Sequence, residues 1–540
     1  MTTKSRSVLN ATAFGAGAIG IGLLALGMAM TGPACSDSKV NTPGTAGTNG
    51  GSGGTGTAGT VGSAGTGGSA GDTAGTTGTA GDTAGTGGGV AGAGGSAGGS
   101  GGSGGATGGS GGGTGGTGGS ACTSTNVVPA PAVISADTMW TRCNTYLLPA
   151  DTKVAVRAPA ILTIEAGTVI KAQGNSALVI TQGAKIIANG TKESPIVFTS
   201  NKTVGSRAPG DWGGLIIMGK APQNTNANST PPSATAIFEA YGASEPDGVF
   251  GGNDPDDSSG SLKYVRSEFG GFAYMPNREW NNFTFCGVGR GTVVDYIQSH
   301  RGADDSIEFF GGTVNVKHLV LTQNEDDGFD TDNGWEGKAQ FVVIQHVAPR
   351  GTDASNGYES DNHANAPSYT AVPRTLPLIY NVTSIGKKDY IGAQSFGALF
   401  RRGTGGTYYN HIITKWASGV VEVRDMDTMN QITANMLFIK NSIFFDNMGA
   451  DGNWPAAMAT GDIDEKAIFT NAAWMNREVD PMLGDASNLT APNFKPAAGS
   501  PALTGGAAPP STDAFFEQVT FVGAVGTDDW TTGWTAYPQN

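Results

Sequence analysis

The chain has 540 residues, of which 88 are glycine and only 14% are charged, and its formal net charge at pH 7 is −14. Such an acidic chain argues against nucleic acid and anionic lipid headgroups as binding partners. A collagen-like protein is excluded because the glycines do not follow a strict three-residue period.

The N-terminus has the layout of a secretory signal. After a short basic start, residues 11–30 carry no charge, and small residues then precede Cys35. This arrangement resembles the lipobox of bacterial lipoproteins, although Gly32 stands where that motif usually has leucine. We therefore expect residues 1–34 to be a signal peptide and Cys35 to be lipidated. The alternatives are cleavage by an ordinary signal peptidase and retention of residues 11–30 as a membrane span.

The next segment, residues 35–120, is rich in Gly, Ser, Thr and Ala. Between positions 41 and 120 its only charged residues are Asp72 and Asp82. Side chains this small cannot bury enough apolar surface to offset the entropy of ordering, so we expect a disordered, flexible tether. With the lipid, it indicates an outer-membrane lipoprotein or a protein on the extracellular surface of a bacterium.

Two cysteines lie near the start of the segment that we expect to fold, residues 121–540. Disulfides persist in exported proteins, so Cys122 and Cys143 are predicted to form one. Cys286 lies in a strand-like run, and we expect it to be buried and reduced.

The folded segment repeats itself. Residues 297–310 and 319–332 align at an offset of 22 positions (319 minus 297), and their double aspartates 304–305 and 326–327 coincide. A unit of this length is too short for a propeller blade and fits one turn of a parallel β-helix, which rises ~4.8 Å per turn. We predict an all-β protein, a single-stranded right-handed parallel β-helix.

Several motifs give this segment a resemblance. TIEAGTVIKA and GDWGGLIIMGKAP, followed by GADDSIEFFGGTVN, NEDDGFDTDNGW and the ending FVGAVGTDDWTTGWTAY, resemble a family of right-handed parallel β-helix lipoproteins and secreted surface proteins. The resemblance covers residues 135–540. It implies the fold and the location, but the family has no established activity and supplies no catalytic residues.

The C-terminal motif with Trp530 and Trp534 is interpreted as a cap over the last turn. An uncapped solenoid end would expose backbone edges.

Strand alternation predicts a stack of outward carboxylates. If Ile307, Phe329 and Tyr358 point inward, the next residue of each strand points outward, with two further aspartates beside the stack; the resulting candidate metal ligands are Glu308, Asp330, Asp332, Glu359 and Asp361. Oxygen-only ligands suit Ca²⁺ better than a transition metal. The sequence favours a solvated acidic face over this Ca²⁺ site.

Asp305, Asp327 and Asn356 each precede one of the inward residues by two positions. Asp and Asn at such turns commonly accept hydrogen bonds from backbone N–H groups, which is the role we expect for them.

Together these features predict an exported, lipid-anchored surface protein that binds carbohydrate or a surface protein partner without catalysis. The alternative is a Ca²⁺-dependent polysaccharide lyase or a glycoside hydrolase. It would use the acidic strip and the adjacent Arg401, Arg402 and Arg424, an order that resembles the groove of Ca²⁺-dependent lyases. No motif calls for any cofactor besides Ca²⁺.

Overall fold

The computed structural model describes residues 126–228, 233–275, 278–347, 354–390, 394–449, 452–455 and 463–540. The predicted signal peptide, Cys35, the tether and Cys122 lie outside these residues, so the lipid anchor and the Cys122–Cys143 disulfide stay predictions. Cys286 is buried and reduced, as expected. Among the described residues, no helix is both long and apolar enough to cross a membrane.

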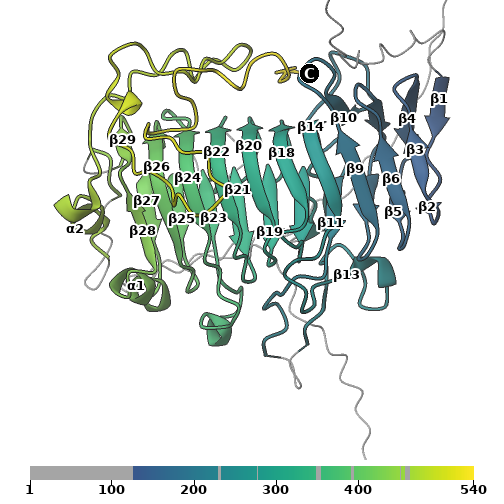
Figure 1. Ribbon diagram of the computed structural model, residues 1–540, viewed down its shortest axis with the longest axis horizontal. Coiled ribbons are helices and arrows are strands. Elements are labelled where there is room, and N and C mark those ends of the chain that lie inside the picture. The colour runs from purple at the N-terminus through teal and green to yellow at the C-terminus, as the bar shows by residue number, and fades with distance from the viewer. Residues whose placement is uncertain are drawn as a thin grey trace, which may run out of the picture. The chain divides into compact units, whose positions relative to one another are not determined.

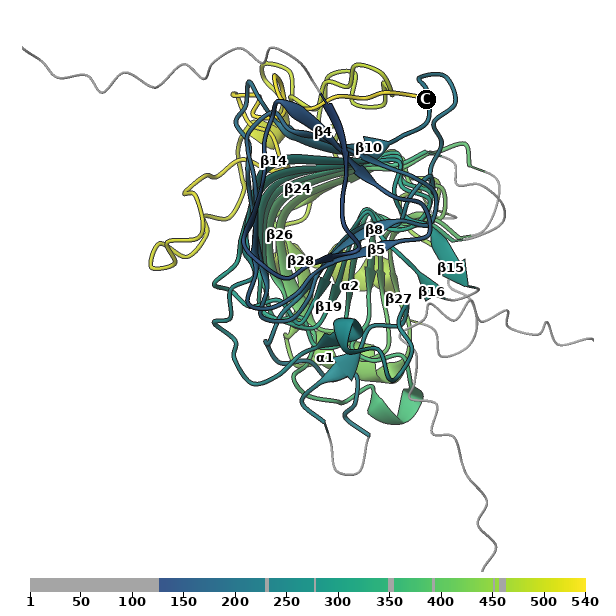
Figure 2. The same cartoon turned by 90° about the vertical axis from the view of Figure 1, so that its right-hand side faces the viewer.

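The chain winds into a parallel β-helix, as predicted from the repeats, and two long sheets form its walls (Figures 1 and 2). Sheet B has 10 strands, all paired in parallel in chain order. They are β2 (Val133–Ile134), β5 (Lys153–Val156), β8 (Ala177–Ile180), β11 (Gly214–Met218), β17 (Phe283–Cys286), β19 (Ile307–Phe310), β21 (Phe329–Asp332), β23 (Tyr358–Ser360), β25 (Phe396–Phe400) and β27 (Gly419–Val423).

Sheet A has 15 strands and bends around the other side of the coil (Figure 2). They are β1 (Asn126–Pro129), β3 (Thr138–Trp140), β4 (Asn144–Leu148), β6 (Ile161–Ile164), β7 (Val169–Ala172), β9 (Lys185–Asn189), β10 (Ile196–Ser200), β14 (Gly260–Glu268), β18 (Val293–His300), β20 (Asn315–Thr322), β22 (Lys338–Gln345), β24 (Leu378–Ile385), β26 (Gly406–Thr414), β28 (Leu437–Lys440) and β29 (Ile443–Phe445).

The long strands of sheet A bend at a repeated backbone conformation. In the early turns β9 and β10 are separate strands, and both pair with the single strand β14. From β14 on, each long strand has one residue of positive φ at its middle, namely Tyr264, Tyr296, His318, Phe341, Asn381 and Asn410. A left-handed residue other than glycine costs about 1–2 kcal/mol, so six in register mark a bend that the stacked neighbours stabilise.

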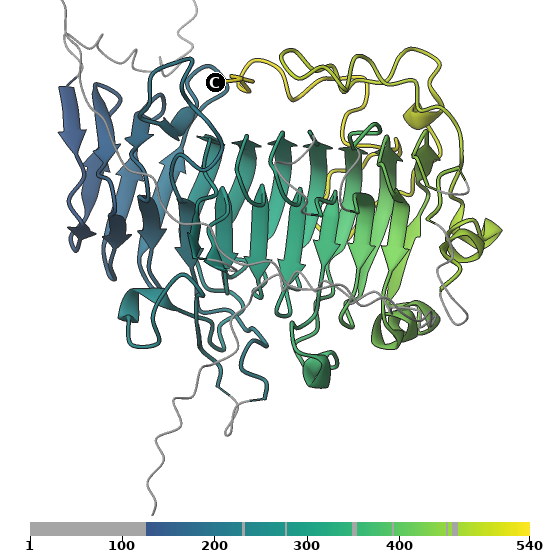
Figure 3. The ribbon, with the colours of Figure 1, turned by 180° about the vertical axis from the view of Figure 1, so that it is seen from behind.

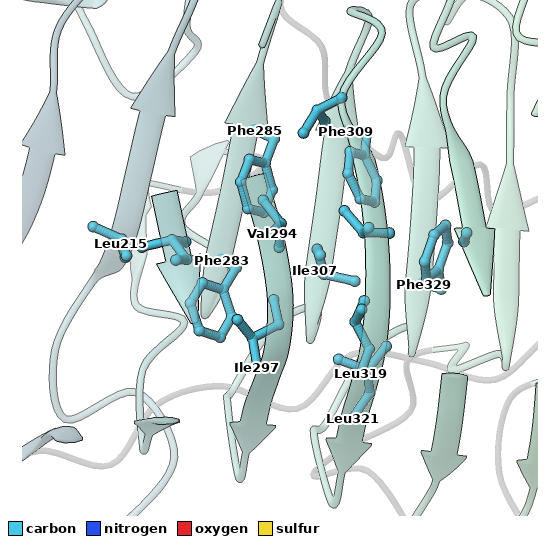
Figure 4. Close-up of a cluster of buried hydrophobic side chains, with 14 of the residues drawn as sticks. Leu215, Phe283, Phe285, Val294, Ile297, Ile307, Phe309, Leu319, Leu321 and Phe329 are labelled. Atoms are coloured by element: carbon cyan, nitrogen blue, oxygen red, sulfur yellow. The ribbon is translucent and has the colours of Figure 1, made fainter. Parts of the chain in front are cut away.

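The interior is filled by inward residues of both sheets, which form one continuous apolar core. Figure 4 shows part of it, where Phe283, Ile307 and Phe329 of sheet B face Ile297 and Leu319 of sheet A. At the late end of the coil, the loops after β27 and β29 add Ile432, Trp454 and Phe469 to this core. The helices there are α1 (Met426–Thr433) and α2 (Glu465–Phe469).

Two antiparallel pairs lie outside the coil: β12 (Ala236–Ile237) with β13 (Val249–Phe250), and β15 (Ala273–Met275) with β16 (Arg278–Glu279). Short 3₁₀ turns complete the structure at Pro246–Gly248, Ala366–Ser368, Ala472–Trp474 and Pro501–Leu503.

The motif with Trp530 and Trp534 does not cover the last turn, which corrects the expected cap. Residues 483–540, here called the C-terminal layer, run back along the outer face of sheet A and end near β14 and β18 (Figures 1 and 3). Trp534 packs edge-on against Tyr264 and Tyr296 in the middle of the coil. The cap was wrongly inferred because chain order does not determine whether a terminal segment continues past the coil or folds back along it.

Candidate functional site

Sheet B presents an outward column of side chains that changes from apolar to acidic along the coil. The strand register aligns, in order, Val179, Ile216, Thr284, Glu308, Asp330 and Glu359. The preceding residues of the last three strands, Ile307, Phe329 and Tyr358, are buried in the core. The predicted outward stack of carboxylates is therefore confirmed, and we call Glu308, Asp330 and Glu359 the acidic ladder.

The apolar part of this column is covered by the protein itself. Val179 and Ile216 pack in a second apolar cluster with Phe238, Tyr241 and Phe250 of the insertion between β11 and β14. This insertion covers the early turns of sheet B, so the polar part of the sheet begins at Thr284.

The acidic ladder is not a solvated face, contrary to the interpretation that the sequence favoured. Asp330 is 5% exposed and Glu359 4%, while Glu308 is half-buried. The loop after β11 and the loop after β23 meet near the ladder, where the Asn224 amide donates a hydrogen bond to the backbone oxygen of Asn362 at 3.0 Å. Removing these carboxylates from water requires compensation by cations or hydrogen bonds.

The corner before each strand of sheet B carries a ladder of capping side chains. Asp305 Oδ1 accepts a hydrogen bond from the backbone N–H of Asp327 at 2.8 Å, and Asp327 Oδ1 accepts one from the N–H of Asn356. Asn356 Oδ1 in turn accepts one from the N–H of Phe396 at 3.0 Å. The expected capping role is confirmed, with each side chain bonding to the next turn of the coil.

The corner and the ladder bring carboxylates together in three groups. In each group, one oxygen per residue lies within 4.8 Å of the others; the groups are Asp304, Asp305 and Asp326; Asp305, Glu308 and Asp330; and Asp327, Asp330 and Glu359. Three hard oxygen donors at this spacing can surround a cation such as Ca²⁺. The sequence predicted a capping role for Asp305 and Asp327 and assigned no role to Asp304 and Asp326, although the alignment of the repeats already placed all four beside the ladder.

Asp305 is the electrostatic centre of these groups. Burial, and then the charges of Asp304, Asp330, Asp327 and Glu308, raise the pKa of Asp305 well above its usual value. A proton on this carboxyl relieves the repulsion, and a bound divalent cation would relieve it more strongly.

We call the three groups of carboxylates together the acidic site. The arginines of the next turns lie beside its last group, which contains Glu359. Arg401 forms salt bridges with Glu359 and with Asp361, the latter at 2.8 Å from Nε, and Arg402 contacts Asp361 at 2.7 Å. Arg424 pairs with Glu422 at 3.2 Å.

This pairing divides the predicted metal ligands. Glu308 and Asp330 belong to the groups of three carboxylates, and Glu359 belongs both to such a group and to the Arg401 ion pair. Asp361 instead pairs with Arg401 and Arg402, and Asp332 accepts hydrogen bonds from Asn333 at 2.6 and 2.8 Å. Neither joins the carboxylate groups found among the described residues.

Two hollows lie elsewhere, beside the C-terminal layer. One of about 580 Å³ is bounded by apolar atoms of Pro496, Ala497 and Leu503, and one of about 250 Å³ lies between Lys415, Asp446 and Asp480. Neither contains a residue of the acidic site, so that site lies on a face of sheet B outside both hollows.

Comparison with known proteins gives one match. A family model described as a pectate-lyase-like β-helix domain matches residues 132–480, which include every strand of sheet B and the whole acidic site. No curated protein and no solved structure matches the chain.

Proposed function

Because the chain belongs to the family of pectate-lyase-like β-helix domains, we propose that it binds an acidic polysaccharide through Ca²⁺ on the outer face of sheet B, without cleaving it. The observation that carries this proposal is the convergence of Asp305, Glu308 and Asp330 within 4.8 Å in a mostly buried setting. The family match supports a carbohydrate-related role and does not by itself separate binding from cleavage.

The donor set fits the proposed cation. Asp305, Glu308 and Asp330 would hold Ca²⁺ with oxygen atoms alone, and the bound ion would supply positive charge for the carboxylates of a uronate-containing chain. The two neighbouring groups provide further oxygens, from Asp326 and Asp327 of the corner and from Glu359 of the ladder.

The test is binding of polygalacturonate by the full chain, with Ca²⁺ and with EDTA. Binding in Ca²⁺ that is lost in EDTA and in Asp330→Asn is the expected result. Glu422→Gln is the matched control, because Glu422 continues the same outward column through Leu399 but pairs with Arg424. Equal binding with and without Ca²⁺, or no binding at all, contradicts the proposal.

A second candidate function, glycoside hydrolysis, is favoured by the raised pKa of Asp305. A carboxyl group whose pKa is raised by burial, with other carboxylates within 4.8 Å, resembles the acid and base pair of glycosidases. If the protein releases reducing ends from polygalacturonate and Asp305→Asn abolishes this release, its function is hydrolysis and not binding alone. The lyase alternative is less favoured, because Arg401, Arg402 and Arg424 all pair with carboxylates.

We also propose that the protein is anchored to a bacterial membrane by a lipid on Cys35 and carried on the glycine-rich tether. The support is the signal layout of the sequence. Cys35→Ser should move the protein from the membrane fraction to the soluble fraction, and membrane association that persists in this variant would favour a retained span.

A further inference from the structure

The end of the C-terminal layer reaches the strand that leads into the acidic site. Arg266 Nη1 of β14 donates to the backbone oxygen of Trp534 at 3.1 Å. Gln298 of β18 makes a double hydrogen bond with Ala536, whose oxygen accepts at 2.8 Å and whose N–H donates at 3.0 Å. Residues 534–540, here called the tail, are therefore held by side chains of sheet A.

The next contact fixes the end of β18. His300 Nε2 lies 2.9 Å from the backbone oxygen of Pro538, and Nδ1 lies 2.9 Å from Thr322 Oγ1. Because a carbonyl oxygen only accepts, Nε2 carries the proton and Nδ1 accepts from the threonine hydroxyl. Burial lowers the pKa of His300 to about 3, in keeping with this neutral form.

One residue further, the chain turns into the corner. Arg301 has positive φ, and its Nη1 approaches the side-chain oxygens of Gln539 at 3.4 Å and Gln323 at 3.5 Å. Gln539 and Gln323 both donate to the backbone oxygen of Leu489 in the same layer, at 2.9 and 2.6 Å. The strand ends of two adjacent turns are thus joined through the tail.

We propose that residues 536–540 are positioning residues of the acidic site, which set its affinity for Ca²⁺ by holding the corner at residues 301–305. This inference rests on the proposed function. The tail touches His300 and Arg301, and the chain runs directly from these residues to Asp304 and Asp305, whose carboxylates stand in two of the three groups. Groups that orient metal ligands typically change metal affinity by about 10–100-fold when they are removed.

The test compares two variants of the full chain, deletion of residues 538–540 and Gln340→Ala. Gln340 is the control, because it makes the same double hydrogen bond with Glu517 of the layer but lies far from the corner along β22. Calorimetric titration with Ca²⁺ should show affinity weakened about 10-fold by the deletion and unchanged by Gln340→Ala. Amide exchange at residues 301–305 should rise only in the deletion.

The outcomes separate the two proposals. Absence of Ca²⁺ binding by the wild-type chain overturns the proposed function and this inference with it. Wild-type binding with equal affinity in the deletion variant overturns the positioning role alone. An equal loss of affinity in both variants also overturns it, because the effect would then be one of general stability.

Discussion

The outer faces of sheets A and B are both shielded from water over part of their length, but by different means. Sheet A carries apolar residues and amides, and the C-terminal layer covers it with Ala524, Val525 and Trp530 packed on Val343 and Ile385. The late turns of sheet B carry carboxylates, which are compensated by arginines and by backbone N–H groups, and burial raises the pKa of Asp305.

The two faces therefore differ in what compensates their polar groups. The C-terminal layer provides hydrogen-bond acceptors for the polar side chains of sheet A. The amides of Gln298, Gln340 and Asn410 each donate to a backbone oxygen of the layer. The acidic groups of sheet B concentrate negative charge in a setting of low exposure, which favours a cation from solution. The two faces should therefore respond differently to substitution and truncation.

The largest effect is expected from deleting residues 505–540. This removes Val522, Ala524, Val525 and Trp534 from buried contacts on sheet A. Each fully buried large apolar side chain contributes about 1.5–3 kcal/mol, so the loss should approach the 5–15 kcal/mol that stabilises a typical domain. Soluble yield and thermal unfolding measure it. A variant that stays soluble with an unchanged melting temperature would show that the layer is not needed to cover sheet A.

On sheet B, Arg401→Ala should destabilise the fold by about 3–5 kcal/mol, because it leaves the buried Glu359 without its arginine and Asp361 with Arg402 alone. Arg424→Ala is the matched control and should cost about 1 kcal/mol or less, since its side chain is 36% exposed. Urea unfolding of both variants gives the two values. Equal losses would mean that burial does not strengthen the Arg401 ion pairs.

Asp305→Asn keeps an acceptor for the N–H of Asp327 and removes the titrating group. The pKa of Asp305 is raised in the folded protein, so its stabilising contribution is present at low pH and is lost as pH rises through that pKa. The variant should therefore gain about 1–3 kcal/mol over the wild type near pH 8, from relieved charge repulsion. Melting temperatures between pH 4 and pH 8 test this, and parallel curves for the two proteins would refute it.

The smallest effect is the opposite pH dependence on sheet A. Burial lowers the pKa of His300 to about 3, below its unfolded value of about 6.5, so its contribution is present at neutral pH and is lost as pH falls below 6.5. When the pH falls from 7.5 to 5.5, the free energy of unfolding should decrease by about 1 kcal/mol less in His300→Gln than in the wild type. Denaturant titrations at both values measure the difference, which should be absent if His300 is exposed in solution.

Much of this structure follows from local sequence patterns. The 22-residue offset of the double aspartates gives the coil, and alternation within strands places Glu308, Asp330 and Glu359 outward. The caps at Asp305 and Asp327 follow from turn chemistry. These features depend on contacts between neighbouring turns, which a repeat displays directly.

The remaining features depend on contacts that no repeat encodes. The burial of the ladder accompanies loops that meet across 138 positions at Asn224 and Asn362, and the tail bonds to Gln298 across 238 positions. The ion pair between Arg401 and Glu359 depends on the register between β23 and β25, which the sequence alone does not determine. Such long-range choices decide which acidic groups are neutralised by the chain and which remain for a cation.

The central claim is that the acidic groups of sheet B hold Ca²⁺, and the most direct measurement is thermal unfolding of the full chain in EDTA and in millimolar Ca²⁺. At 100 times its dissociation constant a ligand stabilises by about 2.7 kcal/mol. With an unfolding entropy of about 2.1 cal/mol/K per residue over roughly 400 folded residues, this corresponds to a rise of about 3 °C in the melting temperature. We predict such a rise for the wild type and none for Asp330→Asn. An unchanged melting temperature in the wild type, or the same rise in the variant, would contradict the claim.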